Sequence, residues 1–400
     1  MTSNFGVGKS KVIQPNCKKS SVDCGYFPSF VSLIRLKSYI ISVFKKLSFP
    51  FLLAFIVHLC TYFPHFVEKH YSTRLYPAIS SFLRTICSIL PLSIGDCIYF
   101  FAGIYILLKI IQFGMKVYQS PRKSNFIGYG LIHFTKALLN IYIAFMLLWG
   151  LNYSREGIGN QLKIAPLPYT TEDVCNLSQD LVMEMNKCRA YLDSFPQRDS
   201  SLKTIYAITF NEYNNARIDY PFLFYKHPVI KSSLYTYWAS WIGYTGYYNP
   251  FSGEAQVRTD LPRLMLPFIC CHEAAHQLGY ADESEASFVA LLVSEKSSSV
   301  YLRYSALIDL YRYTRMELFM RNTFPDGPEK LSPSVKKDLM YIHNFFKREA
   351  FQQSETISNA YDMYLRFNGL DKGIESYNDV VAWAINWRKK LLNSNLGDRR

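Results

Sequence analysis

The sequence HEAAH, from His272 to His276, has the residue types and the spacing of a zinc-dependent hydrolase. Its two histidines are four residues apart, which on a helix of about 3.6 residues per turn places both imidazoles on one face. Both rings could then bind one Zn²⁺, and Glu273 could take a proton from a water molecule beside the metal. The motif predicts His272 and His276 as metal ligands and Glu273 as the catalytic general base.

The residues after HEAAH decide whether a complete metal site can form, because so short a match arises by chance in on the order of one chain in a hundred. Gly279 stands where a helix can end in a left-handed turn. Such a turn would fold the following residues back towards the imidazoles. Three acidic candidates for the third ligand follow at once: Asp282, Glu283 and Glu285.

Glu283 is the third ligand that we favour. Asp282 and Glu285 have the spacing of N-cap and N3 residues in a capping box for the next helix, and that role would occupy both side chains. This leaves Glu283 for the metal, with Ser287 on the same helical face to support the ligands. Glu285 and Asp282 stay open as alternatives, since either carboxylate could also complete a tetrahedral site.

Cysteine ligands are not expected. The nine cysteines show no paired C-x-x-C spacing, so they outline neither a disulfide framework nor a cysteine zinc site. Cys270 and Cys271 precede the motif directly, but they face other directions than the two histidines. We expect them to be packing residues.

Residues 49–153 are expected to form a membrane domain with about three transmembrane helices, after a basic cytoplasmic segment over residues 1–48. The chain is 49% hydrophobic, and its longest apolar stretches approach the ~20 residues that a helix needs to cross a bilayer. One of these regions, beginning at about Phe82, is broken by Pro91 and Gly95, so we expect an interfacial helix before the break and a span after it. The predicted spans are Phe49–Val67, Cys97–Phe113 and Leu131–Tyr153.

Charge predicts the orientation. Residues 1 to 49 carry eight basic side chains and one acid, Asp23, and Lys116, Arg122 and Lys123 follow the second span. Such basic flanks are typical of the cytoplasmic side. Residues 154–400 then emerge on the far side, the periplasm in a bacterium, unless the broken region spans twice. No cleavable signal peptide is evident. A basic nucleic-acid-binding arm is disfavoured because no recognition motif accompanies the charge.

Residues 154–400 are expected to form a soluble helical domain. Helices are predicted over 171–192, with Thr170 or Thr171 as N-cap, and over 201–218. The aromatic and glycine-rich segment Trp238–Val257 predicts a hairpin or edge strand. Further helices are expected over roughly 264–279, 283–317, 334–354 and 374–392.

Several longer segments resemble the bacterial domain-of-unknown-function 3810 family, whose members look like membrane-anchored, gluzincin-type zinc peptidases. The resemblance is carried by SILPLSIGDCIY, LLWGLNYSR, GYYNPFSGEAQV, LPFICCHEAAHQLGYADESEASF, YDMYLRFNG and GIESYNDVV. It implies a multi-pass anchor in the bacterial inner membrane and a zinc-dependent hydrolase domain. It also gives GYYNPFSGEAQV a role as an edge strand beside the metal that could pair with an extended peptide, and a solvent-facing aromatic hairpin stays open as the alternative. Tyr247, Tyr248 or Tyr377 could stabilise an oxyanion.

The sequence therefore predicts a mainly α protein: three transmembrane helices followed by a helical zincin-like metallopeptidase domain with a small β hairpin. Expected partners are Zn²⁺, a peptide or protein substrate and the lipid bilayer. One alternative is a noncatalytic membrane scaffold that retains a structural zinc site. Intramembrane proteolysis is disfavoured because the segment around Asp371 is too polar for hydrocarbon.

Overall fold

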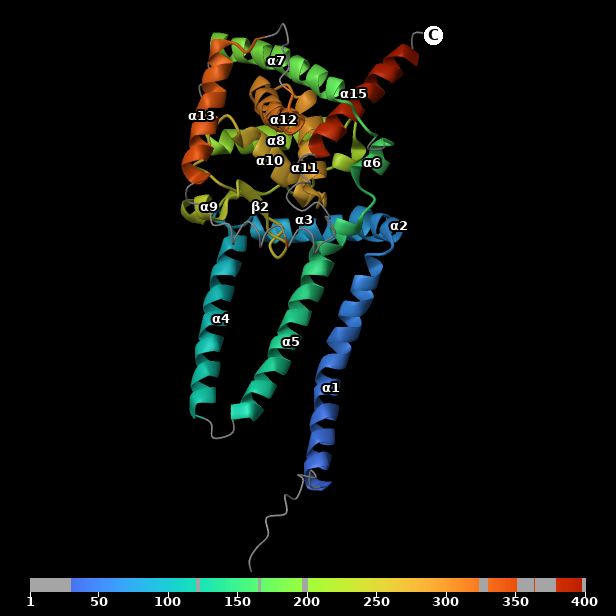
Figure 1. The fold of residues 1–400 in the computed structure, drawn as a ribbon, viewed down its shortest axis with the longest axis vertical. Helices are drawn as coiled ribbons and strands as arrows, with labels where there is room; N and C mark the ends of the chain where they lie inside the picture. Colours follow the sequence, from blue (N-terminus) through green and yellow to red (C-terminus); the bar gives the residue numbers. More distant parts are fainter. Residues whose placement is uncertain are drawn as a thin grey trace, which may run out of the picture. The chain divides into compact units, whose positions relative to one another are not determined.

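The computed structural model describes residues 30–119, 123–164, 167–195, 201–323, 330–350, 363 and 379–397. The chain divides into two compact units, Met1–Ser48 and Phe49–Arg400, and the motif residues lie in the second. The described residues are mainly helical with one small sheet, as predicted (Figure 1). The predicted division into a membrane domain and a soluble domain at residue 153 stays a prediction.

Three described helices are long and apolar enough to cross a membrane, as expected of a membrane protein: α1 (Phe30–Cys60), α4 (Ile94–Gln119) and α5 (Lys123–Leu148). The first ends at Cys60 and not at Val67, because a turn precedes Pro64, which opens the short helix α2 (Pro64–Phe66). The third ends at Leu148 because a 3₁₀ segment, η2 (Gly150–Ser154), follows. The count of three agrees with the prediction, and the bounds differ.

The segment between the first two spans contains η1 (Val67–Leu75) and α3 (Tyr76–Cys87). With 12 residues, α3 is too short to cross a bilayer. Its polar residues Ser80 and Arg84 are buried against the protein, whereas Phe82 and Ile86 are exposed. An outward apolar face suits a helix in the membrane interface. The broken region therefore offers a single candidate span within the described residues.

The helices after residue 154 surround α10, which carries the HEAAH motif. The elements are α6 (Gly157–Leu162), α7 (Thr171–Ser194), α8 (Leu202–Ala216), η3 (Pro221–Leu223), α10 (Leu266–Gln277), α11 (Glu283–Glu295), α12 (Val300–Met320), α13 (Pro333–Ala350) and α15 (Asp379–Gly397). Thr170 caps α7 in a capping box with Asp173, as one of the two predicted N-caps. The predicted helix 283–317 is two helices, because Ser299 caps the new helix α12.

The core places α10 between two hydrophobic clusters. Phe268 and Cys271 belong to one cluster, and Leu266, Ile269 and Cys270 belong to the other. Both cysteines are fully buried and unbridged, which confirms the expectation that they pack. Because α10 is buried on both sides, its position is fixed by the helices around it.

The small sheet has the order β1–β3–β2, with β1 (Ile230–Ser232) parallel and β2 (Gly246–Tyr248) antiparallel to β3 (Ala255–Val257). The predicted hairpin and edge strand are confirmed for residues 246–257. They are wrong for the start of that segment, where α9 (Thr236–Ile242) is helical and ends at Gly243, a glycine with φ of 87°. A left-handed glycine is a common helix terminator.

Residues next to the spans hold the C-terminal end of α10. The last carbonyl groups of a helix lack partners within the helix. Here the Tyr76 hydroxyl and the Ser80 hydroxyl donate to the carbonyl oxygen of Gln277 at 3.1 and 3.0 Å, and the Trp149 indole donates to that of His276 at 3.3 Å. Arg155 donates to the carbonyl of Gly279 at 3.0 Å. The end of the motif helix is thus satisfied by residues from α3 and the segment after α5.

Replacing Gly279 by Ala should destabilise the fold. Gly279 has φ of +88°, and a Cβ there would lie 2.9 Å from the Tyr76 ring and 3.0 Å from Asn152 Oδ1. We expect the free energy of unfolding to fall by at least about 1–2 kcal/mol, the cost of a left-handed conformation for an L-residue. Thermal melting of the purified full-length protein, followed by tryptophan fluorescence, measures the effect.

Gly103→Ala is the matched control, because nothing lies within 4 Å of the Cβ position at Gly103 in α4. It should melt at the wild-type temperature or slightly above. Wild-type melting of Gly279→Ala would show that the turn after α10 does not need a left-handed residue.

Candidate metal centre

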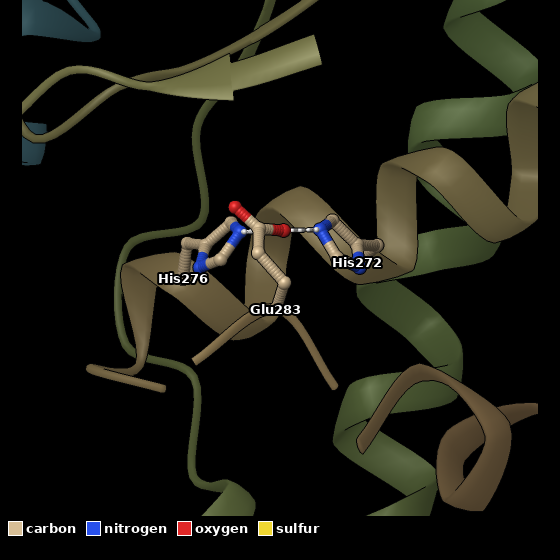
Figure 2. Close-up of side chains that lie close together, drawn as sticks. All are labelled: His272, His276 and Glu283. Atoms are coloured by element: carbon tan, nitrogen blue, oxygen red, sulfur yellow. Dashed lines mark hydrogen bonds and ion pairs between the residues drawn. The ribbon is translucent and has the colours of Figure 1, made fainter. Parts of the chain in front are cut away.

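Three side chains converge where α10 meets α11. The Nε2 atoms of His272 and His276 are 3.1 Å apart. Glu283 Oε2 lies 3.0 Å from Nε2 of His272 and 3.4 Å from Nε2 of His276. Figure 2 shows the Glu283 carboxylate between the two imidazoles. These three residues form a group that could hold a metal ion, and they are the three that the sequence analysis favours as ligands.

Local structure explains this convergence. The helical repeat brings His272 and His276 to one face of α10, and the chain then reverses at Gly279. Its N–H donates to the carbonyl oxygen of His276 at 2.9 Å, and Tyr280 N–H donates to that of Ala275 at 3.2 Å. This pair of bonds is the Schellman arrangement that ends helices with a left-handed residue. Glu283 then begins α11 directly beside the imidazoles.

The donor set fits Zn²⁺ in composition and spacing. In a tetrahedral zinc site with bonds of about 2.1 Å, neighbouring ligand atoms are roughly 3.4 Å apart. The observed separations of 3.1, 3.0 and 3.4 Å come close to that edge length. Two imidazole nitrogens and one carboxylate oxygen are also the ligand types of catalytic zinc sites that keep a position for water.

The outer nitrogen of each imidazole has its own partner. His276 Nδ1 lies 2.6 Å from the carbonyl oxygen of Tyr280, and His272 Nδ1 lies 3.1 Å from Ser287 Oγ. Because a carbonyl oxygen only accepts, Nδ1 of a neutral His276 carries the proton and its Nε2 lone pair points to the centre. Ser287 contacts the predicted ligand His272, as the sequence analysis expects of a supporting residue.

The charges around the centre favour a cation there. Burial alone raises the pKa of Glu283, but the charges of the imidazoles and their hydrogen bonds outweigh it, so the pKa lies well below its usual value. Burial likewise disfavours charge on His276, yet Glu283 outweighs it and raises the pKa of His276 to about 9. A carboxylate that stays ionised in a buried site stabilises a positive charge beside it.

Glu273 lies beside this centre with an unsatisfied carboxylate. It is buried, and its Oε2 atom has no hydrogen-bond partner among the described residues. Burial raises the pKa of Glu273 to about 7. A buried carboxylate oxygen normally has a partner, and a water molecule beside a metal would supply one. A pKa near neutrality also suits a group that must accept and release a proton.

The two alternative ligands have other partners. Asp282 is the N-cap of α11, and its Oδ1 accepts from the N–H groups of Ser284 at 2.8 Å and Glu285 at 3.0 Å. Glu285 does not complete the expected capping box. Its Oε1 accepts from the N–H of Ile158 at 3.0 Å, on the other side of α11. Both side chains are thereby used away from the imidazoles.

A cavity of about 680 Å³ contains the centre. Its wall includes all four predicted site residues and strand β2, from Gly246 to Tyr248. Of the predicted oxyanion donors, Tyr247 donates its hydroxyl proton to Asp96, and the Tyr248 hydroxyl lies 3.2 Å from that of Tyr76. Tyr377 lies outside the described residues. No oxyanion donor is singled out by these contacts.

Sequence reasoning misses the contribution of α12. Asp309, Arg312 and Tyr313 line the same cavity, and Arg312 Nη1 donates to Asp309 Oδ1 at 3.3 Å. Tyr313 lies close to Ser287, which contacts His272. The sequence signal for these residues is their spacing of three and four positions, which gives an otherwise packed helix one polar face. Periodicity alone does not show that this face lies beside a motif that is distant in the sequence.

Comparison with known proteins identifies a family. A family model described as Protein of unknown function (DUF3810) matches residues 71–385. No curated protein and no solved structure matches the chain. The matched region contains the three converging side chains, Glu273 and two of the three candidate spans. Since it covers more than half of the 400 residues, the chain belongs to the DUF3810 family.

Proposed function

We propose that the protein is a membrane-anchored zinc metallopeptidase. The observation that carries the proposal is the convergence of His272, His276 and Glu283 beside the unpartnered, buried carboxylate of Glu273. A purely structural zinc site needs the first three residues but has no use for the fourth. A buried carboxylate without a partner is costly, so it points to a role in chemistry.

Each residue has a defined task in this proposal. His272, His276 and Glu283 would hold the metal ion. When bound, Zn²⁺ would polarise the substrate carbonyl group and make a nearby water molecule more acidic. Glu273 accepts a proton from the attacking water and passes it to the departing amine nitrogen. Ser287 and the carbonyl group of Tyr280 keep the two imidazoles in orientation.

The edge strand supports a peptide substrate. Strand β2 pairs with β3 alone in the described part of the chain, and it lines the cavity beside Glu273. At Gly246 a Cβ would lie 2.5 Å from Glu273 Oε1, so the strand runs directly along the carboxylate. An extended peptide could add to the outer edge of β2 by main-chain hydrogen bonds. Its scissile bond would then lie next to Glu273.

We also place the site on the periplasmic side of a bacterial inner membrane. Helices α4 and α5 are antiparallel neighbours joined through residues 120–122, at the end remote from the metal centre (Figure 1). Lys116 lies in the last turn of α4, Lys123 begins α5, and Arg122 stands between the two helices in the sequence. Because basic connections stay on the cytoplasmic side, the opposite ends of the spans, with the centre, face the periplasm.

Metal analysis tests the ligand set. The purified wild type should hold about one Zn²⁺ per chain, as a single three-ligand site requires. Glu283→Ala should lose it, because only two ligands remain. Asp282→Asn and Glu285→Gln should keep it, since these side chains bond to backbone N–H groups away from the imidazoles. Mass spectrometry of bound metal after gel filtration gives the ratio. If Glu283→Ala kept its zinc and Glu285→Gln lost it, the third ligand would be Glu285, and our assignment of Glu283 would be wrong.

Glu273→Gln separates catalysis from metal binding. The variant should retain zinc, because Glu273 is not one of the three converging ligands. Its rate of peptide hydrolysis should fall by about 10²–10⁴-fold, the typical contribution of a general base. The assay is release of new amino termini from a peptide pool by full-length protein. Unchanged hydrolysis would remove Glu273 from the mechanism. A wild type that binds zinc and cuts nothing would favour the scaffold alternative.

Gly246→Ala should displace the general base without removing a catalytic group. The added Cβ would come within 2.5 Å of Glu273 Oε1 and 2.8 Å of the carboxylate carbon, so the Glu273 side chain must move. A displacement of about 1 Å can cost on the order of 10²-fold in rate, so we expect a loss near that size with zinc content unchanged. Gly103→Ala, with open space around it, is the control and should match the wild type. Full activity in Gly246→Ala would mean that the carboxylate works from another position.

A further inference from the structure

The wall of the metal-site cavity includes residues from two candidate membrane spans. Tyr99 of α4 and Phe145 of α5 both line the cavity. Tyr99 is five residues from the start of α4 at Ile94, and Phe145 is three residues from the end of α5 at Leu148. At about 1.5 Å per residue, they lie roughly 5–8 Å inside the span ends. This depth corresponds to the boundary between lipid headgroups and acyl chains.

Aromatic side chains connect these span ends to the metal centre. The Trp149 ring packs edge-on against the Phe145 ring at 6.1 Å and against the His276 ring at 6.2 Å, between ring centroids. On the other side, Tyr99 stacks on Tyr247 of the edge strand at 6.4 Å. The cavity therefore runs from the level of the bilayer surface to the candidate ligands along an apolar, aromatic wall.

Helices α4 and α5 diverge towards this cavity. At their joined end they touch, since a Cβ on Gly130 would meet the Phe113 ring. Figure 1 shows the two ribbons spread apart at the other end, where the cavity is lined by Tyr99 on one helix and Phe145 on the other. Both spans are mostly exposed along their length. A chain in the bilayer that lies against these exposed helices therefore meets, near their ends, residues that line the cavity.

The surroundings of the cavity also suit the membrane surface. α9 presents exposed Tyr237, Trp238 and Trp241. The segment that leads into it is tied to α4, because Leu234 N–H donates to Asp96 Oδ2 at 2.6 Å. Exposed tryptophan and tyrosine near a span end are typical of the interfacial aromatic belt. The outward apolar face of α3 has the same preference. The residues near the cavity thus include the types that favour a membrane interface.

We infer that the substrate is a polypeptide anchored in the same membrane and cut a few residues from the bilayer surface. This rests on the proposed peptidase function and adds the substrate class. The anchored chain leaves the bilayer between α4 and α5, places an apolar side chain in the aromatic cavity, and pairs its backbone with β2. In the reaction the water oxygen bonds to the carbonyl carbon and the C–N bond breaks. One proton of the water passes through Glu273 to the amine nitrogen, and the second leaves the new carboxyl group for the amine, so the products are a carboxylate and an ammonium group.

A pair of matched peptide pools tests the inference. In the anchored pool, random sequences of about 20 residues are attached to one common membrane span and reconstituted with the full-length protein in vesicles of phosphatidylethanolamine and phosphatidylglycerol. In the free pool, the same sequences are added to these vesicles without the span. We expect the anchored pool to yield at least about 10-fold more product that depends on Glu273, because tethering raises its effective concentration. Mass spectrometry should place the cuts within about ten residues of the span, the reach of a short extended segment.

Each other outcome contradicts a specific claim. Equal products from both pools, with cuts spread evenly, would overturn the membrane-anchored substrate and leave the peptidase function intact. Products from neither pool would contradict the function and the inference together, and so would release of fatty acid from the vesicle lipids in place of peptide products.

Photo-crosslinking gives a readout that does not depend on activity. The test protein is Glu273→Gln with p-benzoylphenylalanine in place of Tyr99. The control carries this residue in place of Tyr105, a tyrosine of the same helix that does not line the cavity. The anchored pool should crosslink at position 99 at least several-fold more than at 105. Equal crosslinking at the two positions, or equal crosslinking of the anchored and free pools at 99, would overturn entry between the spans.

Discussion

The carbonyl groups at the C-terminal end of α10 are the constraint on which the candidate site depends. A helix that ends in a buried place must find donors for its last carbonyls. Here the donors come from Tyr76, Ser80 and Arg84 of α3 and from Trp149 after α5. The end of the motif helix is therefore built by the residues that flank the candidate spans. Loss of those donors would leave buried carbonyls unpaired at the very turn that orients His276 and Glu283.

The same arrangement explains why the cavity at the candidate site is lined by residues near the span ends. Arg155 shows the linkage most directly, because it pairs with Glu68 through two bonds of 2.9 and 2.8 Å and also donates to the carbonyl of Gly279. A paired, buried arginine with a third acceptor is held in one geometry. The turn after α10 is thus connected to η1, and the catalytic chemistry that we propose takes place where the chain meets the membrane.

The charges of the site carry the case for a metal. Two imidazole nitrogens and a carboxylate oxygen lie 3.0 to 3.4 Å from one another, and with both imidazoles neutral they would direct lone pairs to a common point. Ser287 and the carbonyl of Tyr280 hold the outer nitrogens, so the inner ones face that point. Glu273 adds a second carboxylate whose burial costs energy unless it has a partner. A divalent cation with a bound water satisfies all of these groups at once.

The local parts of the site could be predicted from the sequence, and the distant parts could not. Helical spacing predicts that His272 and His276 share a face, and Gly279 predicts the turn that returns Glu283 to them, because both depend on neighbouring residues. The partner of Glu285 is Ile158, far away in sequence, so local capping rules predict the wrong bond. The polar face of α12 and the donors from α3 are likewise set by tertiary packing. The aromatic start of the predicted hairpin forms the helix α9, which ends at Gly243. Glycine can end a helix as well as a strand, so its position in the sequence did not distinguish the two.

X-ray absorption at the zinc edge of the purified full-length protein tests the central claim most directly. The account predicts two imidazole nitrogens and oxygen ligands at about 2.0–2.2 Å with no sulfur in the wild type, and no bound zinc to give a signal in Glu283→Ala. A sulfur shell at about 2.3 Å, which would require Cys270 or Cys271 as a ligand, or a protein that takes up no zinc, would contradict it.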